Sequence, residues 1–336
     1  MVLITGASGL VGSHLLLEIL QHTTEKVTAV YRNEIKKDDV LKLFKHYAPE
    51  NYEVLFDRII WIQGDVLDVC FLDEHFQGVS TVYHCAAKVS FVRKDFLALQ
   101  SVNGVGTANV VNACLDHGVK VLAYVSSTSA LGSKDGEVVT EETRWEKTAT
   151  TSGYSISKYS AEKEVWRGME EGLNVVVVNP CLIIGAGNWN DSSLTLLRAV
   201  DRGLSFYTTG ANAVVDARLV AAAMVKLVLQ KVYNERYLLI GSNISFLGLF
   251  SAIAMRLGKK PPHRKVSKML MGVAWRLASF MAWLKGSSSS ITKESARSAF
   301  CTTVYSSTKI NAVFPELKNY TLEETIDNAV TGRIQH

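Results

Sequence analysis

The stretch that decides the fold lies at the start of the chain and reads Val2-Leu-Ile-Thr-Gly-Ala-Ser-Gly-Leu-Val-Gly12. Its aliphatic beginning predicts a buried strand, and the apolar spacing that starts at Leu10 predicts a helix. The glycines between them permit a tight turn and a close approach of the backbone to a ligand. Because a helix N-terminus presents free N–H groups and the positive end of its dipole, the stretch predicts a pyrophosphate cradle, with a plain glycine-rich turn as the alternative. The residues expected to bind are Thr5, Gly6, Ser8, Gly9, Leu10, Val11 and Gly12.

Short β-branched runs alternate with amphipathic segments through the first half of the chain. The runs lie at residues 27–30, 59–62, 81–83, 121–125 and 175–178, and the helical segments at 10–21, 102–116 and 154–170. Unbroken Val/Ile runs are typical of strands buried on both faces, and their alternation with helices is typical of parallel βαβ units. The sequence therefore predicts an α/β fold with a doubly wound parallel Rossmann sheet.

The pattern changes after Asn179-Pro180, where a loop rich in Gly, Asn and Ser begins. A helical segment at 216–229 and a strand at 237–240 then indicate a return to the sheet. We therefore expect a nucleotide-binding domain of residues 1–178 with a return segment at 214–241. Residues 179–213 and 242–336 are expected to form a smaller, mostly helical substrate-binding domain.

The end of the second predicted strand indicates which nucleotide binds. An NAD-selective protein would carry Asp or Glu here, whereas this chain has Arg32, followed by Lys36 and Lys37. A guanidinium suits a 2′-phosphate through charge-assisted hydrogen bonds, so NADP is expected, with NAD as the alternative. Asp65-Val66, after the third strand, is a candidate for the adenine edge, and a turn aspartate is the other interpretation.

A phenol and an ammonium lie one helical turn apart in Tyr154-Ser-Ile-Ser-Lys158. A hydroxyl cluster that includes Ser127 follows the strand at 121–125, at the strand ends where ligands bind in open parallel sheets. Reduction of a carbonyl leaves an alkoxide that needs a proton, and a nearby ammonium lowers the pKa of a tyrosine toward the neutral range. We therefore expect Tyr154, Lys158 and Ser127 to be catalytic; a helix-surface pair is the alternative.

The composition excludes several classes of function. The chain has 36 Lys and Arg against 32 Asp and Glu without a long run of like charge, so nucleic acid is not an expected partner. The histidines show no metal-ligand spacing, and no metal site is expected. The five cysteines form no CxxC pair and indicate buried thiols of a reducing compartment. No signal-peptide pattern is visible, which makes the cytoplasm the expected location.

An apolar segment at residues 265–285 carries its large side chains at helical spacing, with Arg276 near its middle. Its longest apolar stretch, Met269 to Leu284, contains Arg276 and is only 16 residues long, shorter than the roughly 20 residues that span a bilayer, so no transmembrane helix is expected. The spacing predicts a helix packed in the smaller domain, and contact with a membrane surface is the alternative.

Taken together, these motifs resemble the extended short-chain dehydrogenases/reductases, the NAD(P)-dependent epimerase/dehydratase superfamily. The resemblance covers nearly the whole chain. It rests on residues 5–12, Gly64-Asp-Val66, His84-Cys-Ala-Ala87, Asn103-Gly-Val-Gly-Thr107, Ser126-Ser127, Tyr154-Ser-Ile-Ser-Lys158, Asn179-Pro180 and Val215-Asp-Ala-Arg218. It implies that Tyr154 is the acid/base, that Lys158 is its partner and binds the nicotinamide ribose, and that Ser127 orients the carbonyl.

The resemblance also implies roles for residues around the cofactor. Ala86 and Ala87 would line it, Pro180 would lie near the nicotinamide, and Asn103 would tie a helix to neighbouring backbone. Ser126 and Thr128, on either side of Ser127, stay open as alternatives for the orienting hydroxyl.

Departures from the family pattern narrow the chemistry that the resemblance implies. Dehydratases of the family usually follow their hydroxyl residue with Asp-Glu, whereas this chain has Thr128-Ser129. Epimerases usually show Tyr and Arg where this chain has Leu131 and Asn179. The pattern is closer to dihydroflavonol 4-reductase-like and hydroxysteroid dehydrogenase-like members, which act on less polar carbonyls and alcohols.

The expected activity is therefore NADP-dependent hydride transfer between cofactor and a relatively apolar ketone or aldehyde, or the reverse oxidation of the alcohol. An NAD-dependent sugar-nucleotide epimerase and a non-catalytic nucleotide sensor are the alternatives. Family members often pair through helices of the nucleotide domain, so the resemblance also implies a homodimer.

Overall fold

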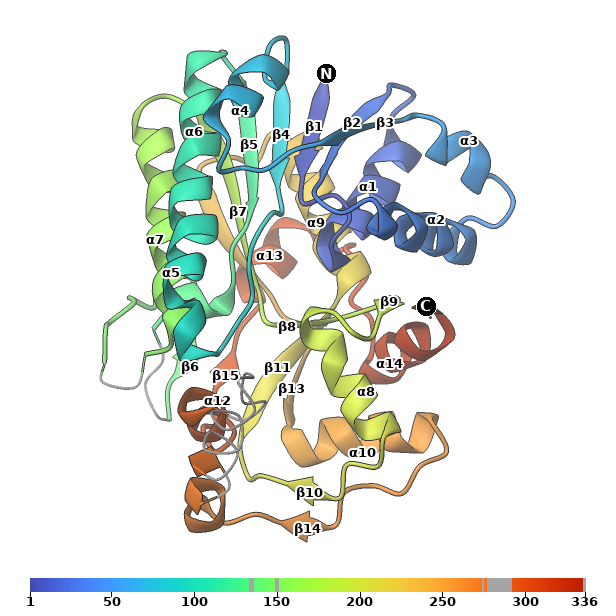
Figure 1. The fold of residues 1–336 in the computed structure, drawn as a ribbon, viewed down its shortest axis with the longest axis vertical. Helices are drawn as coiled ribbons and strands as arrows, with labels where there is room; N and C mark the ends of the chain where they lie inside the picture. Colours follow the sequence, from blue (N-terminus) through green and yellow to red (C-terminus); the bar gives the residue numbers. More distant parts are fainter. Residues whose placement is uncertain (133–135, 149–150, 274, 277–291, 335–336) are drawn as a thin grey trace.

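The computed structural model describes residues 1–132, 136–148, 151–273, 275–276 and 292–334. At its centre lies a seven-stranded parallel sheet in the order β12-β7-β5-β4-β1-β2-β3 (Figure 1). Its strands are β1 (Val2–Thr5), β2 (Val27–Tyr31), β3 (Ile59–Gln63), β4 (Thr81–His84), β5 (Val121–Val125), β7 (Asn174–Pro180) and β12 (Glu235–Leu239). The predicted doubly wound parallel sheet is confirmed.

Helices cover both faces of this sheet (Figure 1). On one face, α1 (Leu10–His22) packs against α9 (Ala217–Leu229), with α2 (Ile35–Tyr47) beside α1. On the other face, α6 (Gly106–Asp116) lies between α7 (Gly153–Glu170) and α4 (Val69–His75). The strands alternate their side chains between the two cores: Ile4 enters one and Leu3 the other. An unbroken apolar run is therefore required, which is why the sequence predicts these strands correctly.

The chain order of the strands reverses between β1 and β4, which lie side by side in the sheet. Ligands of open parallel sheets bind at the carboxyl ends of the strands beside such a switch point. The loops after β1 and β4 therefore mark where a nucleotide is expected.

The segment predicted as one helix at 102–116 begins as a turn of π-helix, η2 (Gln100–Val105), which follows α5 (Phe96–Leu99). Within η2, Asn103 is almost fully buried, with 1% of its surface exposed. It accepts a hydrogen bond from Lys88 N at 2.7 Å and donates to Lys88 O and to Ser157 Oγ, each at 2.9 Å. The expected structural role of Asn103 is confirmed, because it ties the loop after β4 to α7.

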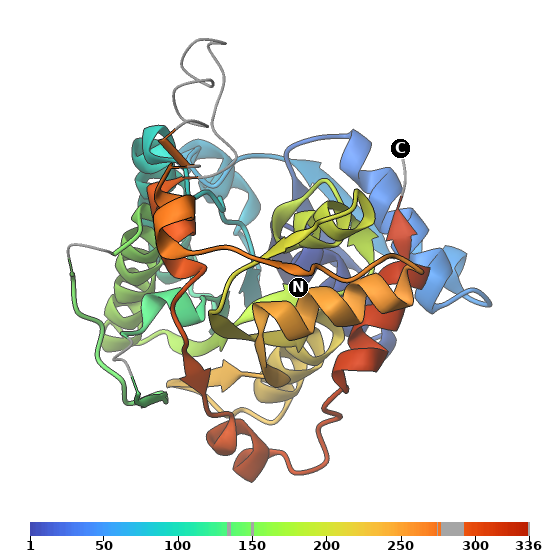
Figure 2. The ribbon, with the colours of Figure 1, turned by 90° about the horizontal axis from the view of Figure 1, so that it is seen from below.

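A smaller sheet in the order β13-β11-β8 lies beyond the carboxyl edge of the large one (Figure 1). It consists of β8 (Leu182–Ile184), β11 (Ala211–Asp216) and β13 (Ser242–Ser245). The helices α8 (Thr195–Asp201), α10 (Phe246–Arg256) and α14 (Leu322–Thr331) pack around it, and Figure 2 shows α10 and α14 side by side. The chain returns from β11 through α9 and β12 to the large sheet; the division into two domains stays a prediction.

Short elements complete the described chain. They are α3 (Tyr52–Phe56), α12 (Lys293–Ser298), α13 (Thr308–Val313), β6 (Val138–Val139), β9 (Gly187–Asn188), β10 (Phe206–Tyr207), β14 (Arg264–Lys265), β15 (Val304–Tyr305), β16 (Arg333–Ile334), and the 3₁₀ turns Arg93–Asp95, Thr128–Ala130 and Ser192–Leu194.

The apolar segment at 265–285 is helical at residues 268–273, where Met269 is 84% exposed and Leu270 54%. Residues 274 and 277–285 lie outside the described residues, so the predicted packing of this segment stays a prediction. Over the described ranges, no helix is long and apolar enough to cross a membrane. The cysteines are unpaired, as expected. The expectation that they are all buried is wrong, since Cys70 and Cys301 are exposed.

Candidate active site

The glycine turn after β1 is closed by direct backbone contacts. Gly6 has φ +67°, and a Cβ on it would lie 2.6 Å from the backbone nitrogen of Ala86. A Cβ on Gly12 would lie 2.2 Å from Gly6 O. The turn therefore requires glycine at both positions, and it places the loop after β1 directly against the loop after β4.

The first turn of α1 is open to an anion. Its N-cap is Gly9, which has no side chain to cap the free N–H groups, and the turn contains no acidic residue. Gly9 is exposed, while Ser8, Leu10 and Val11 are half-buried. These observations fit a dinucleotide pyrophosphate. Thr5 is different, because it is fully buried and its hydroxyl is hydrogen-bonded to His84 Nδ1 at 2.6 Å.

His84 ends β4 beneath this turn. Its second ring nitrogen is hydrogen-bonded to Thr107 Oγ1 at 3.0 Å, and its ring stacks on Tyr124. Burial lowers the pKa of His84 to about 3, so the ring is neutral at neutral pH. His84 therefore supports the strand ends from below. Among the described residues, no group of His, Cys, Asp and Glu side chains could bind a metal ion.

Arg32 and Asp65 come together at the ends of β2 and β3. The guanidinium Nη1 lies 3.9 Å from Asp65 Oδ2, and the two side chains are 62% and 42% exposed. Asp65 Oδ1 also accepts a hydrogen bond from Leu67 N at 3.0 Å, so the carboxylate shapes its own turn as well. Val66 is buried. Both an exposed cation and a carboxylate are thus available at the carboxyl ends of β2 and β3.

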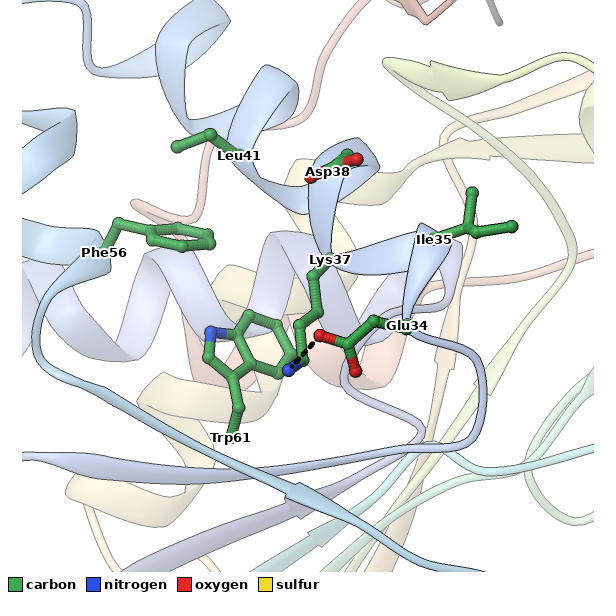
Figure 3. A pocket seen from close by; sticks show the side chains of 7 residues that line it. All are labelled: Glu34, Ile35, Lys37, Asp38, Leu41, Phe56 and Trp61. Atoms are coloured by element: carbon green, nitrogen blue, oxygen red, sulfur yellow. Dashed lines mark hydrogen bonds and ion pairs between the residues drawn. The ribbon is translucent and has the colours of Figure 1, made fainter.

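The two lysines that follow Arg32 in the sequence are engaged elsewhere. Lys36 Nζ donates to Asp191 Oδ2 at 2.7 Å, and Lys37 Nζ donates to Glu34 Oε1 at 2.7 Å. Figure 3 shows the Lys37–Glu34 pair at a pocket whose lining residues are Glu34, Ile35, Lys37, Asp38, Leu41, Phe56 and Trp61. This pocket contains none of the predicted site residues. Arg32 is therefore the best placed of these cations for a 2′-phosphate.

Tyr154 stands in the first turn of α7, whose N-cap Ser152 accepts a hydrogen bond from Ser155 N. Its ring meets Phe91 edge-on, with the ring centroids 5.7 Å apart. Burial raises the pKa of Tyr154 to about 12, and a hydrogen bond with Ser127 acts in the opposite direction. The phenol is therefore protonated at neutral pH and bonded to the hydroxyl that the sequence predicts as its neighbour.

The other two hydroxyls of the cluster have different partners. Ser126 Oγ donates to Glu162 Oε2 at 2.5 Å, and Thr128 is hydrogen-bonded to Tyr305. Ser127 itself accepts a hydrogen bond from Ser129 N at 3.1 Å, which orients its side chain. Of the three candidates, Ser127 is thus the one that interacts with Tyr154, and its role as the orienting hydroxyl stays a prediction.

Lys158 lies one turn after Tyr154 and is only 1% exposed. Its ammonium donates to Tyr124 Oη at 2.7 Å and to Val125 O at 2.8 Å. Burial lowers the pKa of Lys158 to about 7, opposed chiefly by the negative charge of Glu162. In this structure Ser127, and not Lys158, lowers the pKa of Tyr154. An effect of Lys158 on the phenol with cofactor bound stays a prediction.

The remaining predicted residues lie at the same edge of the sheet. Ala86 and Ala87 follow β4 and are half-buried, and Pro180 is the buried last residue of β7. Ala86 lies against Gly6, as described above. The structure therefore brings all the predicted cofactor and catalytic residues to the carboxyl ends of the strands.

Several site residues are absent from the sequence predictions. Phe91 and Tyr124 contact Tyr154 and Lys158 from other elements, and no spacing in the sequence indicates either contact. Glu162 is one turn after Lys158 on α7, so helical spacing alone could have indicated it. Trp189 is different, because the sequence indicates it as either a packing anchor or a cover over the substrate. It is 2% exposed and donates to Ala329 O at 3.1 Å, so it packs inside the protein.

Comparison with known proteins agrees with this geometry. Residues 2–233 match the model of the NAD dependent epimerase/dehydratase family. A putative dihydroflavonol 4-reductase of Synechocystis sp. is 29% identical over 283 residues, which is 81% of this chain and 77% of that protein. Cinnamoyl-CoA reductase 1 of Petunia hybrida is 29% identical over 248 residues, covering 70% of this chain and 71% of the relative.

A solved structure shows the same fold. The crystal structure of gox2253 superimposes with a TM-score of 0.78 at 23% identity, covering 99% of this chain and 97% of the other. At this level of identity the likeness concerns the fold, including the smaller C-terminal part.

Proposed function

Because the chain belongs to the NAD dependent epimerase/dehydratase family and is an NAD(P)-dependent enzyme of the extended short-chain dehydrogenase/reductase type, we propose that it reduces an apolar ketone or aldehyde with NADPH. The observation that carries this proposal is the protonated Tyr154 phenol, bonded to Ser127 and bordered by Phe91. A proton donor, an orienting hydroxyl and an apolar wall are the groups that such a reduction needs from the protein.

The chemistry divides between cofactor and protein. The bound nicotinamide dinucleotide would supply the hydride that adds to the carbonyl carbon. Ser127 would donate a hydrogen bond to the carbonyl oxygen and orient it. Tyr154 would transfer its phenolic proton to that oxygen as the negative charge develops, and solvent would later return a proton to the phenolate. Lys158 would stabilise the phenolate through its positive charge.

The preference for NADP is supported by Arg32, which is exposed at the end of β2, where an NAD-selective protein carries a carboxylate. Its guanidinium has five N–H donors in a planar arrangement that matches a phosphate. Lys36 and Lys37 already have carboxylate partners, so the proposal depends on Arg32.

An apolar substrate is supported by exposed side chains of the loop after β4, which Asn103 fixes. Phe91, whose ring meets that of Tyr154, is 41% exposed, and Val89, two residues earlier in the same loop, is 47% exposed. Large apolar side chains left accessible next to a catalytic group indicate a surface that a ligand covers. A flat, apolar carbonyl compound would bury this surface, whereas a sugar nucleotide would leave its hydroxyls without partners there.

A Tyr154→Phe variant tests the mechanism. NADPH consumption is measured against aromatic, steroidal and aliphatic carbonyls with the wild type, Tyr154→Phe and the matched control Tyr159→Phe. Tyr159 lies on the same helix and stacks on Trp145. We expect Tyr154→Phe to lose roughly 10²- to 10⁴-fold in turnover, the usual contribution of a general acid, with little change for Tyr159→Phe.

Turnover by Tyr154→Phe at the wild-type rate would remove the proposed proton donor. Purification of the protein with tightly retained NAD, and no net consumption of NADPH with any carbonyl, would favour epimerisation instead. A homodimer and a cytoplasmic location stay predictions; the mass in solution, measured by sedimentation, tests the first.

A further inference from the structure

A second carboxylate lies beneath the candidate catalytic residues. Glu162 is 3% exposed, one turn after Lys158 on α7. Oε2 accepts hydrogen bonds from Ser126 Oγ at 2.5 Å and Asn179 Nδ2 at 2.8 Å, and Oε1 accepts one from Trp166 Nε1 at 3.2 Å. Arg236 Nη2 lies 3.3 Å from Oε1. A buried carboxylate is costly unless it is paired in this way, so the surroundings are built for its charged form.

Two of these partners connect Glu162 to the backbone of Ser127. Asn179 Nδ2 donates to Ser127 O at 3.0 Å as well as to the carboxylate. Because both partners are acceptors, the amide nitrogen must face them, which fixes the rotamer of Asn179. Ser126 is bound through its hydroxyl to Glu162 and through its N–H to Val178 O. The segment that presents the Ser127 hydroxyl is thus fixed on both sides through one carboxylate.

Glu162 also faces Lys158 with a negative charge, because the two side chains lie one helical turn apart on α7 and are 3% and 1% exposed. The titratable groups that face Lys158 are Tyr124 from β5, His84 and Cys85 from the end of β4, and Glu162 from its own helix. Burial raises the pKa values of Tyr124 and Cys85 and lowers that of His84, so these three are neutral at neutral pH. Tyr154 is protonated as well. Among the described groups around this ammonium, Glu162 therefore supplies the negative charge.

We propose that Glu162 is a positioning residue of the reductase, which keeps Lys158 protonated in its buried site and holds the Ser126–Ser127 segment in register with Tyr154. It acts through these residues and does not touch the substrate. The proposal rests on the function proposed for Tyr154, Lys158 and Ser127.

A Glu162→Gln variant tests the charge, because glutamine has nearly the same size and keeps an acceptor oxygen. The matched control is Glu164→Gln, on the same helix, whose carboxylate pairs with Arg167 at the surface. The protonation of Lys158 is followed in the NMR spectrum of protein labelled with ¹³C at lysine Cε, with the resonance assigned by Lys158→Met. This measurement needs neither substrate nor turnover.

We expect the pKa of Lys158 to fall by about one unit or more in Glu162→Gln, since removal of a nearby opposite charge favours the neutral amine. A lysine is charged below its pKa, so the alkaline limb of the kcat/KM profile should move to lower pH by the same amount. Activity should then be roughly tenfold lower just above neutral pH and recover as the pH falls. Glu164→Gln should show the wild-type titration and profile.

Arg236→Met provides a second variant if Glu162→Gln does not fold. It removes the cation that pairs with Glu162 on its solvent side. The negative charge of Glu162 then acts on Lys158 without this compensation, so the pKa of Lys158 should rise. An unchanged Lys158 titration in either variant would overturn the proposal, even if activity fell uniformly at every pH. If the Lys158 titration shifts as expected but Tyr154→Phe keeps wild-type turnover, the result would contradict the proposed function and leave the role of Glu162 intact.

Discussion

At neutral pH the phenol of Tyr154 carries its proton, because burial raises its pKa to about 12. A donor in this state suits the reduction of a carbonyl, in which the product oxygen gains a proton. In the opposite direction the phenolate must form first, and that step becomes easier as pH rises. At the scale of single residues, the proposed reduction therefore has its proton donor in the protonated state at neutral pH.

Arg32 can be tested by substitution with serine. We expect Arg32→Ser to weaken NADPH binding roughly 10- to 100-fold, the effect of losing a charge-assisted hydrogen bond, and to leave NADH binding nearly unchanged. Titration of both cofactors by fluorescence measures the difference. Lys37→Gln is the control, since Lys37 already pairs with Glu34. Tighter binding of NADH than of NADPH by the wild type would refute the assignment of Arg32.

At the scale of elements, α7 collects the proposed chemistry on one face. Tyr154, Lys158 and Glu162 follow one another at intervals of one turn, so all three face β5 and the loops at its end. The short turn into α1 brings together the residues expected to bind the cofactor. Its glycines allow the backbone of the loop after β1 to touch that of the loop after β4. A rigid helix and a closed turn keep the two halves of the site at a constant separation.

Gly12→Ala tests the closed turn. The added methyl would lie 2.2 Å from Gly6 O, so the backbone must move, with an expected loss of about 1–3 kcal/mol in the free energy of unfolding and weaker NADPH binding. Gly104→Ala is the control, because its nearest neighbours would be side-chain atoms 3.9–4.0 Å away. Thermal unfolding and cofactor titration provide the comparison, and wild-type behaviour of Gly12→Ala would contradict the described packing.

At the scale of the whole molecule, the loop after β8 is held both by the C-terminal segment and by α2. Arg333 lies over the Trp189 ring, and β16 pairs with β9. Lys36 reaches Asp191 in the same loop from the start of α2. The loop that begins the smaller part of the chain is therefore held from both sides of the molecule.

Trp189→Ala tests this connection. Removal of a fully buried indole should lower the free energy of unfolding by about 3–5 kcal/mol through loss of burial and creation of a cavity. Trp189→Phe retains much of the burial but loses the hydrogen bond to Ala329 O, so its loss should be nearer 1 kcal/mol. Urea unfolding measures both. Unchanged stability with an altered KM for the carbonyl substrate would mean that Trp189 contacts the substrate after all.

The sequence by itself determined the strands of the large sheet, the helices α1, α6, α7 and α9, and the glycine turn, because these depend on local periodicity and on backbone freedom at single positions such as Gly6. It also indicated the Tyr154–Lys158 pair, since residues four apart on a helix share a face. It did not indicate the smaller sheet of β8, β11 and β13. Only the tertiary structure decided what these groups contact. Lys158 meets Tyr124, Lys36 meets Asp191, and Glu162 reaches Asn179 through contacts between elements far apart in the chain. Such partners depend on how whole elements pack, and no local pattern of residues encodes that packing.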